Sequence, residues 1–242
     1  MRRNNHHEPI NIPESLENHP FYGFTLDDDQ KYFRDCIWSE DNIVTICDAK
    51  AGTGKTLVAI GTANLLVQYG RYDGICYIVF PTMEHKQGFI PGAPEDKNAP
   101  YMQPLRDALY SLNINPDTAI ISENNLQAVK NGTAYVNFMS HTYLRGTNFE
   151  NQVVIIDEFQ NGYGDECKKV LTRMHDSVKA VIIGATGQCD LLSHKERSGF
   201  APYLKAFTKY KEEHPEDKRV AICQLRTNHR GWFSSFCDDV EI

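Results

Sequence analysis

The sequence lacks the features that mark membrane-spanning, secreted and disulfide-stabilised proteins. No stretch approaches the roughly 18 consecutive apolar residues of a membrane-spanning helix. Residues 1–10 contain two arginines but no apolar segment after them, so they do not resemble a secretion signal. The seven cysteines form no C-x-x-C pair, and their odd number disfavours a disulfide framework. We therefore expect reduced thiols and a cytoplasmic location.

An excess of positive charge is also missing. The chain has 25 Lys and Arg against 32 Asp and Glu, a net charge of -7. This balance argues against a protein coated in nucleic acid, although a local basic groove is still compatible with it. Low-complexity tracts and internal repeats are absent, and the 41% of hydrophobic residues suits one packed core. We expect an N-terminal extension over residues 1–24 and a single domain over residues 25–242.

Short apolar runs recur along the chain and alternate with stretches of helical spacing. The expected strands are 42–48, 74–80, 134–139, 152–158, 180–185 and 220–225. The expected helices include 25–40, capped by Thr25, then 56–70, ending near Gly70, and 101–112, after a long loop at 81–100. Strands that are apolar on both faces and alternate with helices indicate an α/β fold. We expect a mostly parallel sheet with helices on both faces.

A glycine-rich loop connects the first expected strand to the second expected helix. The phosphate-binding pattern G-x-x-x-x-G-K-[ST] fits this stretch except at its first position, where Ala49 replaces glycine. A methyl group is acceptable there if the backbone φ is negative. The residues expected around the phosphates are all present: Ala51, Gly52, Thr53, Gly54, Lys55 and Thr56. In such loops backbone N–H groups surround the anion, the lysine reaches the β- and γ-phosphates and the hydroxyl binds Mg²⁺.

In the stretch "VVIIDEFQ" at 153–160, two carboxylates directly follow an apolar run. Beside a phosphate-binding loop, Asp157 is expected to hold Mg²⁺ and Glu158 to orient the attacking water as general base. Taken alone, the pair could equally be a solvated strand end. Gln188 follows another expected strand, so it should lie at the sheet edge where α/β proteins bind ligands. It is a candidate γ-phosphate contact, the alternative being an ordinary surface glutamine.

Five blocks of sequence together resemble the successive motifs of PhoH-like ATPases. They are "AGTGKT" (51–56), "GFIPGAPEDKNAPYMQPLRDAL" (88–109), "YLRGTNFENQVVIIDEFQN" (143–161), "KKVLTRM" (168–174) and "IGATGQCDL" (183–191). The resemblance implies a RecA-like ATPase core related to superfamily 1 helicase motors, with ATP and Mg²⁺ as cofactors. It also implies association with RNA metabolism or phosphate stress. By the same resemblance Gln30 matches a glutamine that reads the adenine edge, although a helix-surface role is an alternative.

The chain departs from the family pattern at four positions. The family usually has glycine at Ala49, arginine at Phe80, aspartate at Ala185 and a second arginine at Thr147. The expected magnesium site and general base survive these changes, while some residues that couple hydrolysis to other events do not. Nucleotide binding is therefore a safer expectation than fast turnover.

The stretch "LRTNHRGWFSSFCDD" (225–239) follows the last expected strand. It resembles a helicase motif whose arginine reaches the γ-phosphate, which makes Arg230 a candidate charge stabiliser. The alternative is a surface arginine at the start of a helix capped by Asn228. Arg145 and Arg173 are rival candidates that could act across a subunit boundary.

Two functions follow from these observations. The first is a Mg²⁺-dependent ATPase that acts on RNA or single-stranded DNA. Because superfamily 1 motors use two RecA-like domains and this chain has one, a homo-oligomer, such as a ring, would supply the missing half. The second is a nucleotide-dependent assembly or regulatory module in which ATP orders the loop 81–100 and hydrolysis is a slow timer.

Overall fold

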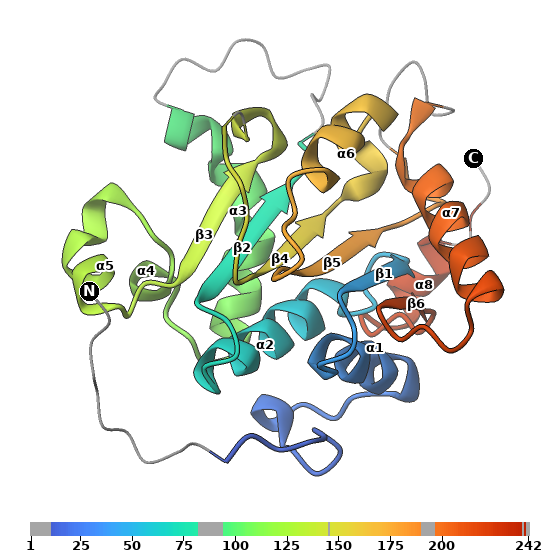
Figure 1. Ribbon diagram of the computed structural model, residues 1–242, viewed down its shortest axis with the longest axis horizontal. Coiled ribbons are helices and arrows are strands. Elements are labelled where there is room, and N and C mark those ends of the chain that lie inside the picture. The colour runs from blue at the N-terminus through green and yellow to red at the C-terminus, as the bar shows by residue number, and fades with distance from the viewer. Residues whose placement is uncertain (1–10, 82–93, 145, 190–196, 239, 241–242) are drawn as a thin grey trace.

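A six-stranded, all-parallel sheet forms the centre of the protein (Figure 1). The computed structural model describes residues 11–81, 94–144, 146–189, 197–238 and 240. The strand order is β3-β2-β4-β5-β1-β6. The strands are β1 (Val44–Ala49), β2 (Gly74–Val79), β3 (Val136–Ser140), β4 (Gln152–Asp157), β5 (Lys179–Gly184) and β6 (Val220–Leu225). All six expected strands are present, and the α/β fold with a parallel sheet is confirmed.

Helices cover both faces of the sheet (Figure 1). One face packs against α1 (Asp28–Trp38), α2 (Lys55–Gln68) and α3 (Pro94–Ser111). The other packs against α6 (Gly164–Leu171) and α7 (Phe200–Glu213). Because successive strand residues point to opposite faces, the continuously apolar strands feed both cores. Each fully buried apolar side chain stabilises the fold by roughly 1.5–3 kcal/mol.

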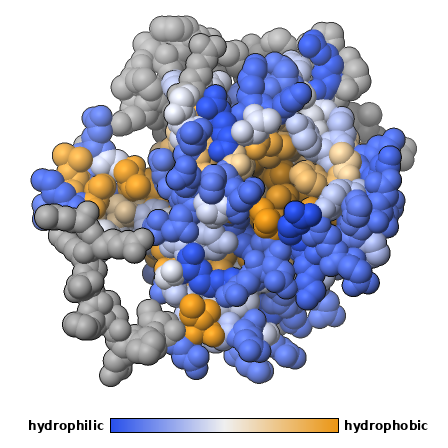
Figure 2. All heavy atoms as spheres, in the orientation of Figure 1, coloured by the Kyte–Doolittle hydropathy of each residue, from blue (hydrophilic) through white to orange (hydrophobic). Residues whose placement is uncertain are grey.

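Shorter elements complete the described chain. They are α4 (Pro116–Ala119), α5 (Leu126–Asn131), α8 (Trp232–Asp238) and the 3-10 turns η1 (Phe21–Gly23), η2 (Glu123–Asn125), η3 (His141–Tyr143) and η4 (Phe159–Asn161). Figure 2 shows polar side chains over most of one face, with an apolar hollow near its centre, between the positions of α6 and α7. Among the residues described, no helix is both long and apolar enough to cross a membrane.

The helix starts differ from the sequence expectations. Asp27, not Thr25, caps α1, because its carboxylate accepts the Gln30 N–H while the Gln30 side chain accepts the Asp27 N–H. The helix α3 begins at Pro94, so the end of the expected loop is helical, and proline suits a first helical turn. Residues 82–93 of that loop lie outside the described residues. Gly70 directly follows the C-cap of α2 and has a φ of +71°, as a helix-ending glycine should.

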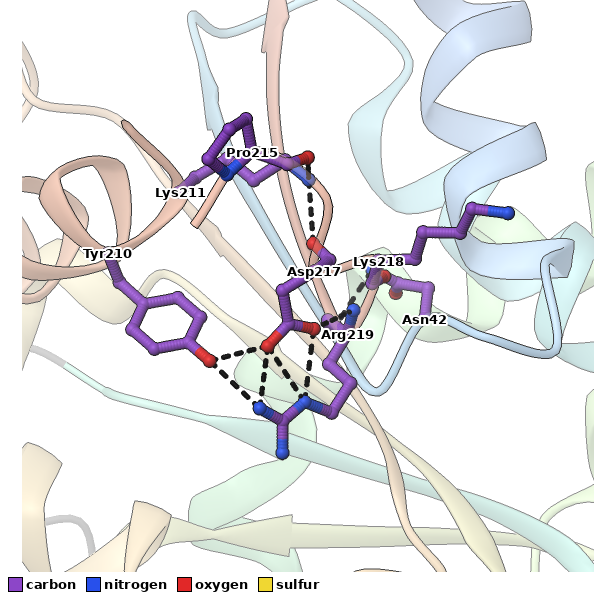
Figure 3. A network of polar contacts seen from close by, with 7 residues as sticks. All are labelled: Asn42, Tyr210, Lys211, Pro215, Asp217, Lys218 and Arg219. Atoms are coloured by element: carbon purple, nitrogen blue, oxygen red, sulfur yellow. Dashed lines mark hydrogen bonds and ion pairs between the residues drawn. The ribbon is translucent and has the colours of Figure 1, made fainter. Parts of the chain in front are cut away.

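A polar network fixes the turn between α7 and β6 (Figure 3). The Asp217 carboxylate accepts hydrogen bonds from the Tyr210 hydroxyl and from the Arg219 guanidinium and backbone N–H. These donors hold the pKa of Asp217 well below its usual range. Asn42 donates from its side chain to the Lys218 carbonyl at 3.4 Å, so the turn is tied to the segment that precedes β1. The network therefore sets β6 beside β1.

A fully buried lysine supports the same end of the sheet, at the start of the interior strand β5. Lys179 begins β5, and its ammonium donates to the carbonyls of Ser39 and Asn42. Burial, and then the charge of Arg71, lower the pKa of Lys179 from 10.5 to about 8. The unfolded chain therefore binds the Lys179 proton more tightly than the folded protein does.

This shift predicts how stability depends on pH. As pH rises from 8 to 10.5, the free energy of unfolding of the parent should increase by up to about 3 kcal/mol relative to that of a Lys179→Met variant. The reason is that folding buries a charged ammonium only while Lys179 is protonated. Urea unfolding of both proteins across that range measures the difference, and titrations elsewhere cancel. A difference that does not change with pH would contradict the expected shift.

Candidate nucleotide-binding site

Residues 50–54 connect β1 to α2 and are the loop that the sequence predicts to bind phosphate, called the phosphate-binding loop below. Gly52 and Gly54 both have a φ of +76°, a left-handed conformation that glycine adopts at little cost. Ala49 is the last residue of β1, is buried, and is not among the described residues with positive φ. Its methyl group is accommodated as expected. No side chain caps the start of α2, so its first N–H groups are available to an anion.

The two expected motifs meet at the carboxyl edge of the sheet. The Thr56 hydroxyl donates to Asp157 Oδ2 at 2.8 Å, although the two residues are separated by 101 positions. Lys55 Nζ lies 3.8 Å from Glu158 Oε1. The sheet brings them together, because β1 and β4 both flank β5. Four candidate residues from distant parts of the chain therefore share one site.

The oxygen atoms of Thr56 and Asp157 suit a magnesium ion. Asp157 is almost fully buried, and its Oδ2 atom accepts hydrogen bonds from two hydroxyl groups. Within the described residues no group of three or more His, Cys, Asp or Glu side chains gathers as a metal cluster. Mg²⁺ needs no such cage, since it is usually held by one or two protein oxygens, phosphates and water. The donor set therefore fits Mg²⁺.

Glu158 sits in a strained backbone conformation and is held by a buried amide. Its φ of 54° and ψ of 36° are left-handed, which costs a non-glycine residue about 1–3 kcal/mol and is found most often at functional sites. The Gln160 side chain donates to Glu158 Oε2 at 2.6 Å and accepts from the Ala185 N–H at 3.1 Å. Gln160 thereby fixes one carboxylate oxygen of the expected base. Gln160 lies within the family-like block 143–161, but its contact with Glu158 was not predicted from the sequence.

A cavity of about 540 Å³ adjoins the loop at the same edge. Its lining includes Lys50, Gln188 and Arg226, so the expected position of Gln188 at the sheet edge agrees with the structure. The Thr186 N–H and hydroxyl both donate to the Asp48 carboxylate, at 2.9 and 2.8 Å. Where the family usually has an aspartate, this chain has Ala185, and Asp48 on the neighbouring strand supplies a carboxylate to the adjacent turn. The γ-phosphate contact of Gln188 stays a prediction.

The C-terminal segment 226–230 packs on the phosphate-binding loop. The His229 N–H donates to the Gly52 carbonyl at 2.8 Å, and a Cβ added to Gly52 would lie 2.6 Å from Asn228 Oδ1 and 3.2 Å from Arg230 Cδ. Arg230 is therefore beside the loop of its own chain. Asn228 accepts the Arg230 N–H and donates to Ser234 in α8, which keeps the segment in place.

The same segment is joined to the start of α1. The Arg226 guanidinium donates to both Asp29 carboxylate oxygens at 2.9 and 2.6 Å, which lowers the pKa of Asp29. His229 Nε2 lies 2.8 Å from Asp27 Oδ2. The start of α1, the loop and segment 226–230 thus form one connected unit.

Gln30 is buried and makes contacts that the sequence did not predict. Besides capping α1, its side chain donates to the Thr53 carbonyl at 2.9 Å and so fastens the loop to the helix. A contact of Gln30 with adenine stays a prediction. Of the rival arginines, Arg173 donates to the Thr147 carbonyl at 3.1 Å and lines a separate cavity with His141 and Glu166. Arg145 lies outside the described residues.

The chain is similar to PhoH-named proteins from several bacteria. It is 34% identical to Protein PhoH2 of Bacillus subtilis over 154 residues, which cover 62% of this chain and 34% of that protein. It is 30% identical to Protein PhoH of Escherichia coli K12 over 189 residues, which cover 77% of this chain and 49% of that protein. The match to the PhoH-like protein of Mycobacterium leprae is 31% identical and covers 67% of this chain and 44% of that one. The chain thus spans about half the length or less of these relatives.

Solved helicase structures are also similar to this chain at low identity. The Hef helicase domain of Pyrococcus furiosus aligns with a TM-score of 0.46 and 13% identity, over 88% of this chain and 41% of that one. The Pif1 helicase of Candida albicans aligns with a TM-score of 0.40 and 17% identity, over 89% of this chain and 43% of that one. The model of the family described as PhoH-like protein matches residues 25–226, and the chain therefore belongs to the PhoH-like family.

Proposed function

We propose that this protein binds ATP with Mg²⁺ and hydrolyses the bond between the β- and γ-phosphates. One observation carries the proposal: Lys55 and Thr56 of the phosphate-binding loop meet Asp157 and Glu158 at the end of β4. Lys55 neutralises phosphate charge, and Thr56 and Asp157 would hold Mg²⁺. The ion would supply charge stabilisation at the phosphates. Glu158, held by Gln160, orients and deprotonates the attacking water.

We further propose that the protein acts as a homo-oligomer on RNA or single-stranded DNA. The support is family membership together with the one parallel sheet of the described residues. The described cysteines are free thiols, which supports the proposed cytoplasmic location.

One observation favours the alternative of a nucleotide-dependent assembly module. Phe80, where the family usually has arginine, is buried and stacks on His141 with ring centroids 4.4 Å apart. Phe80 is uncharged, and burial lowers the pKa of His141, so this stack does not replace the permanent charge of the usual arginine. In this alternative ATP changes the affinity for a protein partner and hydrolysis is slow.

The test separates the two functions by the response to nucleic acid. Phosphate release is measured with Mg²⁺-ATP alone and with a panel of RNA and single-stranded DNA, and the mass in solution is measured under the same conditions. Stimulation by a nucleic acid supports the motor-type ATPase. Slow hydrolysis that no nucleic acid changes supports the assembly module, and the absence of ATP binding rejects both.

Lys55 provides the first prediction for this site. Replacing Lys55 with alanine should abolish ATP binding or weaken it severely, because the loop loses the cation directed at the phosphates. Calorimetric titration with ATP measures the affinity. Lys209→Ala is a matched control, since Lys209 lies on the surface of α7 and pairs only with Glu213 among the ion pairs of the described chain. Parental affinity in Lys55→Ala would reject the assignment of the loop.

A further inference from the structure

A buried tyrosine contacts the carboxylate that is proposed to hold the metal. Tyr77 lies in β2 and is 1% exposed, and its hydroxyl donates to Asp157 Oδ2 at 2.7 Å. The sheet register explains this contact. In the parallel pair β2–β4, Val79 lies opposite Asp157 and Tyr77 lies opposite Ile155. Tyr77 is therefore the diagonal neighbour of Asp157 on the same face, a distance that an aromatic side chain can span.

The surroundings of Tyr77 fix its ring and its proton. The ring packs in the main core and stacks on Phe138, with centroids 6.2 Å apart and an interplanar angle of 24°. The hydroxyl is the donor in this contact, because an ionised carboxylate can only accept hydrogen bonds. A buried tyrosine hydroxyl needs an acceptor, and here that acceptor is Asp157.

Three donors fix the orientation of the Asp157 carboxylate. Oδ2 accepts from the hydroxyls of Thr56 and Tyr77, and Oδ1 accepts from the Glu158 N–H at 2.9 Å. The Thr56 hydroxyl is itself a proposed metal ligand, so it would both contact Asp157 and bind the metal. The Tyr77 hydroxyl has no metal to bind, because it reaches the carboxylate from within the core. It is therefore the side chain that can orient Asp157 independently of the nucleotide.

We propose that Tyr77 is a positioning residue that holds Asp157 in the orientation that receives the divalent metal. This inference rests on the proposed function, since it assigns a role at the same metal site. Tyr77 does not touch the nucleotide and acts only through Asp157. Residues that orient metal ligands in this way typically contribute about 10- to 100-fold to metal affinity.

The experiment measures metal binding without turnover. Mn²⁺, which accepts the same oxygen ligands and is visible by electron paramagnetic resonance, is titrated into protein saturated with a non-hydrolysable ATP analogue. Tyr77→Phe keeps the ring and removes the hydroxyl. We expect it to bind Mn²⁺ about 10-fold more weakly or worse, while metal-free nucleotide affinity stays within about twofold of the parent.

The control is another tyrosine hydroxyl with a defined partner. Tyr135 donates to Asn64 at 2.5 Å, away from Asp157, so Tyr135→Phe should leave Mn²⁺ affinity unchanged. A double-mutant cycle with Asp157→Asn adds a second measurement. Once Asp157 is replaced, removing the Tyr77 hydroxyl should have little further effect on Mn²⁺ binding, because the positioned carboxylate is already lost.

The outcomes separate this inference from the proposed function. Parental Mn²⁺ affinity in Tyr77→Phe would overturn the positioning role and leave the ATP site intact. A fall in melting temperature alone, with unchanged Mn²⁺ affinity, would also overturn it, since Tyr77 would then be a structural residue only. If the parent protein binds neither nucleotide nor Mn²⁺, the proposed function itself fails.

Discussion

Replacing Arg230 with alanine should lower the rate of ATP hydrolysis by about 10³–10⁵-fold and change ATP affinity only slightly, as removal of an arginine finger does. The expected cause is the loss of a cation beside the charge that develops on the γ-phosphate. Arg230 is suited to this role because its side chain lies against Gly52 and its backbone is held by Asn228. Single-turnover hydrolysis and equilibrium ATP binding measure the two effects separately. Arg106→Ala is a matched control, since Arg106 on α3 pairs with Asp117 on α4 and belongs to no part of the candidate site.

Mixing two inactive variants determines which subunit supplies Arg230. Because Arg230 lies beside the loop of its own chain, we expect a mixture of Arg230→Ala and Glu158→Gln to stay inactive. Partial recovery of hydrolysis would instead show that the arginine acts across an interface, where one site combines two intact halves. A parental rate in Arg230→Ala alone would reject the role, and Arg173 and Arg145 would then be tested.

Glu158→Gln should lower turnover by roughly 10²-fold or more and leave binding of ATP and Mg²⁺ intact. Glutamine preserves the shape of the side chain and its place beside Gln160, but it cannot accept a proton from water. The variant is measured by steady-state phosphate release and by ATP titration. Glu213→Gln is the control, because Glu213 forms only an exposed pair with Lys209 among the ion pairs of the described chain. An unchanged rate would show that another group orients the water.

The sheet was predictable because its strands are marked locally. The run "VVII" within β4 is apolar on both faces, as expected of a strand buried between two helical layers. The start of α3 was not predictable in the same way, since the prolines and charges around Pro94 are typical of loops. The cap of α1 was missed because Asp27 and Thr25 are both good capping residues, and only the Gln30 contacts distinguish them.

The residues of the candidate site also fall into two groups: those that a sequence motif marks and those that it does not. Two sequence motifs indicate the chemistry of Lys55, Thr56, Asp157 and Glu158. It was therefore possible to predict that these four residues share one site. The supporting residues could not be predicted, because their roles depend on contacts between strands. The same pairing of β2 with β4 brings Tyr77 to Asp157, and no local pattern distinguishes this tyrosine from core filler.

The position of β1 in the sheet has a consequence for how the protein is made. Its partners β5 and β6 lie far along the chain: Val44 pairs with Ala180 and with Val220. At 5–20 residues per second, the ribosome releases the first of these strands on the order of ten seconds after β1. Throughout that interval the nascent chain carries an apolar strand with both edges unpaired, which is a target for chaperones and for aggregation. Slower translation between β1 and β5 should therefore lower the yield of native protein without any change in its sequence.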